Sequence, residues 1–369
     1  MPISTIPTSG LSSDQGVNFR NLIINGDMSV AQRATSATSL TGSGYNTCDR
    51  WRLRNASLGT WTQSQSTDVP SGQGFAKSLK MDCTTADASP SASDDLRIDA
   101  RLEGQNLQML KKGTSNAESL TLSFWVKSNK TGTYTVALTD KDNSRQISQA
   151  YTISSSNTWE KKILTYVADT TGTLGNDNNN SFETNFVLAC GTNFSSGTLQ
   201  TSWGSTVDAN RSVGQVNLAD STSNEWYITG VQLEVGTTAS DFEFIPFDVN
   251  LQRCKRYYES FGTFGDYLIG YGYGSGSDTA RTSFPFTVEK RVTPTMADVS
   301  SSRQVRINWT SSDGTAVNQN STTQATFSEP NIKNSGYVQI GGYSSIGGGQ
   351  HGYCRMNNAT TTYEADAEL

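Results

Sequence analysis

Residues 119–140 read SLTLSFWVKSNKTGTYTVALTD, and this stretch decides the fold class. In its first half the apolar residues occupy every second position: Leu120, Leu122, Phe124 and Val126. After the turn-forming residues Ser-Asn-Lys-Thr-Gly, a second run alternates in the same way: Tyr134, Val136 and Leu138. Alternation with a period of two, interrupted by Asn and Gly, is typical of half-buried antiparallel strands. The stretch therefore predicts two such strands.

The same alternation returns along the rest of the chain: at 159–167, 182–188, 225–235, 284–288, 305–309 and 338–340. Loops rich in Ser, Thr, Asn and Gly separate these segments. Many short strands with regular turn signals and few helical stretches indicate a two-sheet sandwich, and we expect a jelly roll. The predicted fold class is all-β: a jelly-roll-like β-sandwich, one linking helix and a smaller C-terminal β-domain.

The N-terminal part of the chain divides into an arm and the sandwich. Residues 1–20 are rich in Ser, Pro and Gly, with isolated apolar residues at Ile3, Ile6 and Leu11. A short segment of this kind is typical of a docking peptide or a disordered tail. We interpret it as an N-terminal docking arm. Residues 21–246 form the predicted sandwich, which opens with a strand over NLIING (21–26) and an Asn-Gly turn.

The single convincing helix lies at 249–260, within a linking segment that we place at 247–260. Its apolar residues recur at spacings of three and four: Leu251, Cys254, Tyr257 and Tyr258. Asp248 is suited to cap its N-terminus. Residues 261–369 are rich in Gly and Tyr at their start and then alternate again. We expect this part to be a smaller C-terminal β-domain that binds the receptor.

Composition excludes several classes of function. Charged residues make up 17% of the chain, and the formal net charge is −6. Nucleic-acid binding needs clustered Lys and Arg, so we expect no nucleic-acid partner. The polar N-terminal region indicates neither a signal peptide nor membrane insertion. Five widely spaced cysteines without a CxxC pair indicate free thiols in a reducing cytoplasm rather than disulfides or zinc.

Candidate catalytic groups are few. The chain has one histidine, His351, in a Gly-rich stretch without a nearby nucleophile motif. A carboxylate pair for glycoside hydrolysis remains open, because the fold sets the separation of such a pair. The acidic residues of one polar segment are the candidates, and we expect them to form exposed ion pairs instead: Asp94, Asp95, Asp99 and Glu103.

Two acidic loops, 140–144 and 176–180, resemble calcium loops in residue type. Calcium takes six to eight oxygen ligands, including several carboxylates, and each loop supplies only one or two. An ordinary turn is the better interpretation of both loops. The Gly-rich stretch 341–349 lacks the Lys and Thr of a phosphate-binding loop. We expect no enzyme, no metal and no cofactor.

Aromatic residues are the remaining candidates for binding, because their rings stack on sugar faces while polar groups fix the hydroxyls. We place receptor or glycan recognition on the C-terminal domain, including the 341–351 loop, at these residues: Tyr267, Tyr271, Tyr273, Trp309, Tyr343 and His351. The competing hypothesis is that the sandwich itself binds sugar through Trp61 or Trp203. Trp125 alternates out of phase with the apolar residues of its strand, so it either faces the second sheet or is exposed.

Several phrases of the sequence resemble tail-fibre-like proteins of marine bacteriophages and cyanophages. They are NLIINGDMSVAQR (21–33), TDVPSGQGFAKSLKM (67–81), RLEGQNLQMLKKG (101–113), the 124–140 block, SVGQVNLADSTSNEWYITGVQLEVG (212–236), RCKRYY (253–258) and the terminal ADAEL. FWVKS and ITGVQLEVG also resemble jelly-roll carbohydrate-binding modules. The resemblance covers about 21–260 and is weak over 261–364. It implies a virion protein on a phage tail or particle surface, made in the host cytoplasm, that touches the host.

The resemblance also carries expectations about partners. Phage fibres are usually homotrimers, and we expect protomers to meet through the helix face with Tyr257 and Tyr258. The arm would dock onto another tail or virion protein. We expect a non-catalytic fibre that recognises a host cell-surface polysaccharide. The alternatives are a purely structural, virion-decorating fibre and a polysaccharide depolymerase spike, although no repeat typical of a β-helical spike is visible. The sequence identifies neither the host nor the glycan.

Overall fold

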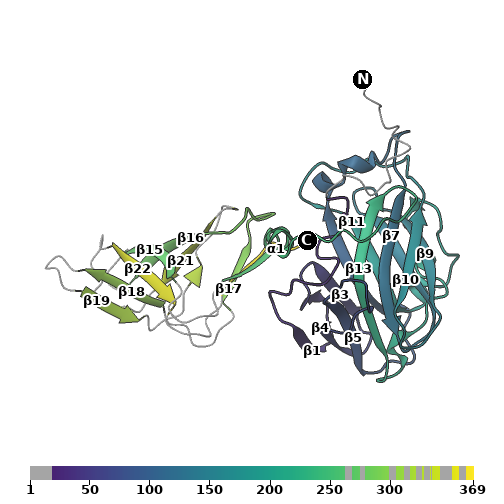
Figure 1. The fold of residues 1–369 in the computed structure, drawn as a ribbon, viewed down its shortest axis with the longest axis horizontal. Helices are drawn as coiled ribbons and strands as arrows, with labels where there is room; N and C mark the ends of the chain where they lie inside the picture. The colour runs from purple at the N-terminus through teal and green to yellow at the C-terminus, as the bar shows by residue number, and fades with distance from the viewer. Residues whose placement is uncertain are drawn as a thin grey trace, which may run out of the picture. The chain divides into compact units, whose positions relative to one another are not determined.

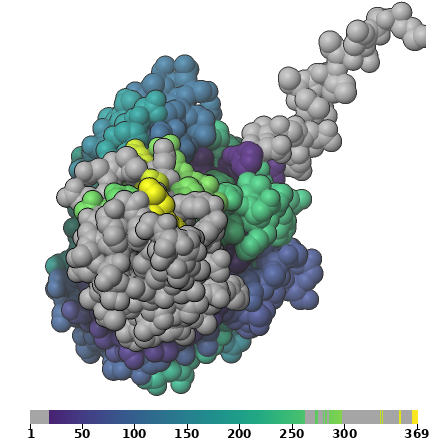
Figure 2. Space-filling model, turned by 90° about the vertical axis from the view of Figure 1, so that its left-hand side faces the viewer, coloured from purple at the N-terminus to yellow at the C-terminus, as the bar shows by residue number. Residues whose placement is uncertain are grey.

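The computed structural model describes residues 19–261 without a break and several shorter stretches after them. These stretches are 268–274, 279–298, 305–310, 316–320, 326–327, 333, 335–340, 351–356 and 363–369. These stretches carry the colours of the bar in Figure 1, and the space-filling view in Figure 2 shows residues 19–261 in colour. The chain forms two compact units: one runs to Asn250 and includes Leu369, and the other contains residues 251–368.

The first unit is built from two antiparallel sheets. In spatial order, sheet A contains β1 (Ser36–Leu40), β4 (Thr60–Ser66), β5 (Ser78–Thr85), β13 (Glu225–Val235), β7 (Leu120–Ser128) and β10 (Glu160–Tyr166). Sheet B contains β12 (Gly204–Ser205), β9 (Arg145–Ile153), β8 (Gly132–Asp140), β11 (Asn180–Cys190), β6 (Asp95–Glu103), β3 (Trp51–Ala56) and β2 (Gly44–Tyr45). Figure 1 shows β13, β7 and β10 side by side. The all-β, jelly-roll-like prediction is confirmed.

The two strands of 119–140 belong to different sheets. Strand β7 pairs with β13 and β10 in sheet A, whereas β8 pairs with β9 and β11 in sheet B. The turn between them therefore crosses from one sheet to the other. The apolar face of each strand points to the shared core, where Phe124 of β7 lies 5.2 Å from Phe186 of β11 between ring centroids. The alternation predicted both strands, and their partners depend on the rest of the chain.

The core between the sheets is rich in aromatic residues. Trp51, Trp61 and Trp226 are fully buried, and Phe186 packs against Trp51 and Trp226 at centroid distances of 6.0 and 6.3 Å. Rings of this size bury large apolar areas, which is the main stabilising contribution to such a sandwich.

Short 3-10 helices and loops complete the first unit. The helices are η2 (Gly104–Asn106), η3 (Gln108–Leu110), η4 (Thr192–Phe194), η5 (Asp208–Asn210) and η6 (Leu218–Asp220). Residues 191–212, here called the covering segment, border the β9 edge of sheet B. The Ser148 amide donates to Gln200 O at 2.7 Å, and the Thr206 amide donates to Ser144 O at 2.8 Å. These bonds hold the covering segment against the sheet.

Three details of the prediction are wrong. NLIING forms a turn rather than a strand, because the Asn21 side chain caps the Ile23 amide and Asn25 adopts a left-handed backbone with φ of 58°. The helix α1 spans Phe247–Lys255, so Asp248 lies in its first turn, and residues 258–260 belong to strand β14 (Tyr258–Phe261). The predicted 284–288 strand ends at Pro285, since β16 covers Ala280–Pro285.

The described strands of the second unit form two antiparallel sheets. One contains β14, β23 (Tyr363–Asp366) and β17 (Thr295–Asp298). The other contains β19 (Ala316–Asn320), β18 (Val305–Thr310), β22 (His351–Met356), β15 (Leu268–Gly274), β16, β21 (Ser335–Ile340) and β20 (Thr326–Phe327). A buried ion pair joins Lys290 to Glu259 of β14 at 2.5 Å.

Candidate functional site

Strand β6 gives sheet B a charged outer face. Its sequence, DLRIDARLE, alternates strictly, and the apolar members point into the core: Leu96, Ile98, Ala100 and Leu102. The other members point to the outer face: Asp95, Arg97, Asp99, Arg101 and Glu103. Because β6 lies between β11 and β3, side chains of both neighbours cover these charges. The outer face is therefore a buried ionic layer rather than a solvated surface.

The carboxylates of this layer have defined partners. Asp95 pairs with Arg54 at 2.7 Å and with Arg97 at 3.0 Å, while Asp99 accepts from Arg101 at 3.1 Å. The expectation of exposed ion pairs at Asp94, Asp95, Asp99 and Glu103 is wrong, because all four residues are at most 6% exposed in the middle of the sandwich face. Burial raises the pKa of Asp99, although Arg101 opposes the shift.

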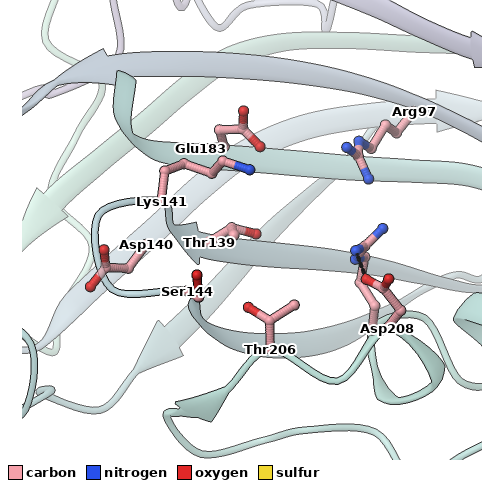
Figure 3. Close-up of a pocket in the computed structure, with 9 residues that line it drawn as sticks. Arg97, Thr139, Asp140, Lys141, Ser144, Glu183, Thr206 and Asp208 are labelled. Atoms are coloured by element: carbon pink, nitrogen blue, oxygen red, sulfur yellow. Dashed lines mark hydrogen bonds and ion pairs between the residues drawn. The ribbon is translucent and has the colours of Figure 1, made fainter. Parts of the chain in front are cut away.

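A pocket of about 230 Å³ opens on this face of sheet B (Figure 3). Segments far apart in the sequence supply its walls: β6, β11, the end of β8, the turn that follows it, and the covering segment. The lining residues are Arg97, Thr139, Asp140, Lys141, Ser144, Glu183, Thr206, Asp208 and Arg211. Sites for drug-sized ligands usually measure roughly 300–1,000 Å³, so this pocket has room for about one sugar ring.

Glu183 forms the floor of the pocket. In the sheet register it lies opposite Arg101 of β6 on one side and Thr139 of β8 on the other. Its carboxylate accepts from Asn180 at 2.8 Å and pairs with Arg101 at 3.3 Å. Burial alone would raise the pKa of Glu183, but the Arg101 charge and neighbouring cations hold this pKa below its usual range. Glu183 is therefore a fixed, ionised acceptor at neutral pH.

The turn between β8 and β9 forms one wall. Asp140 is fully buried, pairs with Lys112 and accepts the Asn143 amide at 3.0 Å. Ser144 has φ of 50°, a left-handed conformation that closes the turn. Asp142 of this turn accepts the Gly175 amide at 2.8 Å, so the two acidic loops of the sequence lie against each other. Their carboxylates serve as turn acceptors, and no cluster of three or more metal-ligating side chains occurs among the described residues.

Two guanidinium groups form the opposite end. Arg97 comes from β6 and is 9% exposed, and Figure 3 shows its guanidinium pointing toward the Asp208 side of the pocket. Arg211 pairs with Asp208 and lies 4.9 Å from the centre of the Phe194 ring. Burial lowers the pKa of Arg97, and the positive charge of Arg211 lowers it further.

The tryptophans of the competing hypothesis are poor sugar platforms. Trp61 is fully buried, and its indole donates to Leu58 O at 2.7 Å. Trp203 is partly buried against the core, with Lys112 5.2 Å from the centre of its ring. Packing within the chain therefore covers the Trp61 ring completely and the Trp203 ring in part. Trp125 lies on the outer face of sheet A and is partly exposed.

Sequence reasoning missed a second aromatic cluster, on the outer face of sheet A. Trp159 packs edge-on against Tyr227 at 6.2 Å, and Lys127 lies 4.3 Å from the centre of the Tyr227 ring. The Trp159 indole donates to Asp68 at 2.9 Å, and Asp68 also pairs with Lys127. The period-two pattern places Lys127 and Tyr227 on the outer faces of β7 and β13, but only the register shows that they are directly opposite.

The C-terminal recognition residues are described only in part. Tyr273 and His351 lie directly opposite each other on β15 and β22, and both are exposed. Tyr271 and Trp309 lie in β15 and β18, where Trp309 is opposite Gly352. The remaining predicted site residues lie outside the described residues: Tyr267, Tyr343 with the rest of the 341–350 loop, and Ile3, Ile6 and Leu11 of the arm. The structure thus brings Tyr273 and His351 together.

The proposed oligomer contact needs correction. Tyr257 and Tyr258 are each 1% exposed, because Tyr257 leads out of the helix and Tyr258 begins β14, which pairs with β23. Neither ring has surface to offer a second protomer. Cys48, Cys83 and Cys254 are buried and Cys190 is partly buried, and these four cysteines form no disulfide with one another. Burial raises the pKa of the Cys190 thiol to about 11.

Comparisons with known proteins find solved structures that are similar in fold, but no related sequence family. No family model and no curated protein matches the chain. A bacteriophage CBA120 tailspike domain, described as enzymatically active, is 14% identical with a TM-score of 0.30, over 58% of this chain and 21% of the tailspike chain. A putative sugar-binding protein from Bacteroides thetaiotaomicron is 13% identical with a TM-score of 0.34, over 58% and 99%. The module TmCBM61, solved with β-1,4-galactotriose, is 9% identical with a TM-score of 0.30, over 58% and 99%.

The tailspike match spans about a fifth of that domain's length. Identities and TM-scores at this level transfer no ligand or activity to the chain. Within the described residues, no helix combines the length and apolar character that a membrane crossing requires.

Proposed function

We propose that this chain is a glycan-binding protein of the phage tail-fibre type, which grips a host surface polysaccharide without cleaving it. The wording of residues 21–260 supports the virion assignment through its resemblance to fibre-like proteins. The pocket on sheet B is the observation that carries the binding assignment. The fibre would be made in the host cytoplasm and carried on the particle.

The chemistry of the pocket suits sugar hydroxyls. Hydroxyl groups of Thr139, Ser144 and Thr206 lie between the charged groups at its two ends. A sugar hydroxyl both donates and accepts, and charged partners make its hydrogen bonds roughly twice as strong as neutral ones do. Glu183 and Asp208 supply acceptors, while Arg97, Lys141 and Arg211 supply donors. Such a mixture can satisfy neighbouring hydroxyls of one ring.

The rigidity of the site is a further argument. Glu183 and Arg97 lie on the central strands β11 and β6, where burial and ion pairs restrict their rotamers. Groups held in place before binding lose little conformational freedom when a ligand arrives. Such sites suit a fibre, because several weak sites on one particle together bind a surface with high avidity.

Retention of host surface polysaccharide on immobilised protein tests the proposal. Glu183→Gln keeps the shape of the side chain and removes the acceptor charge, so we expect retention to fall about ten-fold. Glu118→Gln is the control, because Glu118 is a surface residue paired with Lys111 and does not line the pocket. Equal retention by both variants contradicts the proposal.

Catalysis is tested in the same samples by a reducing-sugar assay. We expect no new reducing ends, and their steady release would favour the depolymerase alternative. A host-adsorption competition separates attachment from a purely decorating role: free protein should slow phage adsorption. The homotrimer and arm docking are part of the proposal, supported by the resemblance. Light scattering tests the trimer, and deletion of residues 2–20 tests docking.

A further inference from the structure

The guanidinium end of the sheet B pocket contains an incompletely used donor set. Arg97 pairs with Asp95 through Nη1 at 3.0 Å, but its Nε has no hydrogen-bond partner among the described residues although the atom is buried. A buried donor without a partner is unfavourable, so the hydrogen-bonding capacity of Arg97 is incompletely satisfied.

Arg211 adds a second cation to the same end of the pocket. Its side chain is 13% exposed and lies on the Phe194 ring, while its carboxylate partner Asp208 is 57% exposed. Because solvent screens the exposed Asp208 carboxylate, Asp208 offsets the positive charge of Arg211 only weakly. Arg97 and Arg211 line one small cavity, and besides burial the positive charge of Arg211 lowers the pKa of Arg97.

The other carboxylates of the lining have their own cations. Glu183 is paired with Arg101, and Asp140 is paired with Lys112. Arg101 and Lys112 are not part of the lining. The pocket therefore offers a ligand two guanidinium groups at one end, with hydroxyl groups beside them.

We propose that this pocket selects an acidic sugar, whose carboxylate or sulfate group lies between Arg97 and Arg211 while its ring hydroxyls bond Thr139, Ser144 and Thr206. This inference rests on the proposed glycan-binding function and specifies the class of glycan. Guanidinium forks match carboxylate and sulfate oxygens geometrically, as they match phosphate. The pocket volume of about 230 Å³ admits one ring with its substituent.

The ordinary alternative is that the Arg97–Asp95 pair within β6 and the Arg211–Asp208 pair within the covering segment contribute only to stability. Under that alternative, removing a guanidinium would change stability but not discriminate between acidic and neutral sugars. A comparison of matched ligands separates the two interpretations.

Titration calorimetry of the full chain with matched probes tests the inference. The first pair is oligogalacturonate and its methyl ester, which differ only in the charge of the carboxyl group. The second pair is a sulfated galactan oligosaccharide and its desulfated form. We expect the acidic member of at least one pair to bind about ten-fold tighter or more. The pair that shows the difference identifies carboxylate or sulfate as the recognised group.

Arg211→Gln should abolish this preference, while Arg211→Lys should retain part of it because the charge remains without the fork. Lys161→Gln is the matched control, since it removes one exposed cation from β10 on the other sheet. Thermal unfolding of each variant shows whether the fold is intact, and Arg211→Lys remains informative where Arg211→Gln unfolds.

Equal binding of acidic and neutral members overturns the inference but leaves glycan binding standing, because retention of host polysaccharide is measured separately. A preference that survives Arg211→Gln, or one that Lys161→Gln removes, also overturns it. If the protein retains no host polysaccharide and binds no member of either probe pair, the proposed function itself is overturned.

Discussion

Replacement of Phe186 by alanine tests whether the aromatic core holds the two sheets together. Phe186 lies on β11, the strand that also carries Glu183 of the pocket, and it is fully buried. Its ring packs on partners from both sheets: Trp51 at 6.0 Å, Phe124 at 5.2 Å and Trp226 at 6.3 Å. The three partner rings cannot move in to fill the space that the truncation leaves, because pairing with neighbouring strands holds their own strands in place.

The magnitude follows from the lost contacts. Truncation of a buried Phe to Ala costs about 3–5 kcal/mol, and each lost aromatic pair is worth roughly 0.5–1.5 kcal/mol within that total. We expect a loss near the upper end, about 4–5 kcal/mol. For a unit of about 250 residues this lowers the melting temperature by about 8–20 °C. Phe186→Leu keeps most of the volume and should cost less than half as much.

Tryptophan fluorescence during thermal or urea unfolding is the appropriate assay. Of the 7 tryptophans in the chain, all but Trp309 belong to the first unit, so the signal reports mainly on the sandwich. The reasoning is refuted if Phe186→Ala shifts the transition no more than Phe186→Leu does. Such a result would mean that the ring contacts contribute little and that the sheets are held mainly by other groups.

Three further predictions concern charge and recognition. The sandwich should lose stability as pH falls through the acidic range, because burial favours protonation of Asp169 but Arg145 and Lys112 outweigh burial and hold the pKa of Asp169 below its usual value. The stability that Asp169 contributes is therefore fully present above its pKa in the unfolded chain and is lost as pH falls through its pKa in the folded chain. Asp169→Asn should flatten a profile of urea midpoint against pH measured between about pH 2 and 6. Glu259→Gln should destabilise the second unit by roughly 3–5 kcal/mol, because Lys290 would keep a buried charge without its carboxylate, and hydrogen exchange of that unit would show it. Tyr273→Ala combined with His351→Ala should reduce host adsorption without a change in melting temperature, since both side chains are exposed; unchanged adsorption would contradict a recognition role for this pair.

The sequence predicted the strands of the sandwich well because apolar residues alternate along them, although β7 and β13 are buried on both faces. In β7 and β13, apolar residues alternate with polar ones, and a single sheet face is enough to produce this pattern. NLIING was mistaken for a strand because it is apolar, whereas its backbone is fixed by the Asn21 and Asn25 side chains. Local patterns predict burial, but side-chain caps and strand partners depend on residues far away in the chain.

The candidate site was beyond the reach of sequence patterns for the same reason. Arg97, Glu183 and Arg211 are separated by many residues, and only the register of β6 with β11 and the path of the covering segment bring them together. The acidic residues of the segment that forms β6 suggested exposed ion pairs, whereas the sheet buries them. Aromatic residues drew the prediction to the C-terminal domain and the competing hypothesis to Trp61, which is buried in the core, and Trp203, which is partly buried against it.

The ionic layer on sheet B has a cost that bears on function. Replacing a buried ion pair by packed apolar residues is often neutral or stabilising, because desolvation offsets most of the attraction between the charges. Stability alone therefore does not account for the charges that β6 carries on its outer face. Positioning of side chains accounts for these charges, since a buried ion pair restricts a guanidinium group to one rotamer. Asp95 restricts Arg97 in this way at the wall of the pocket, and Asp99 and Glu183 restrict Arg101 beneath it. A face that binds a polar ligand needs its donor groups held in fixed positions before the ligand binds. Ion pairs within an ionic layer hold them in this way, whereas an apolar layer contains no donors to position.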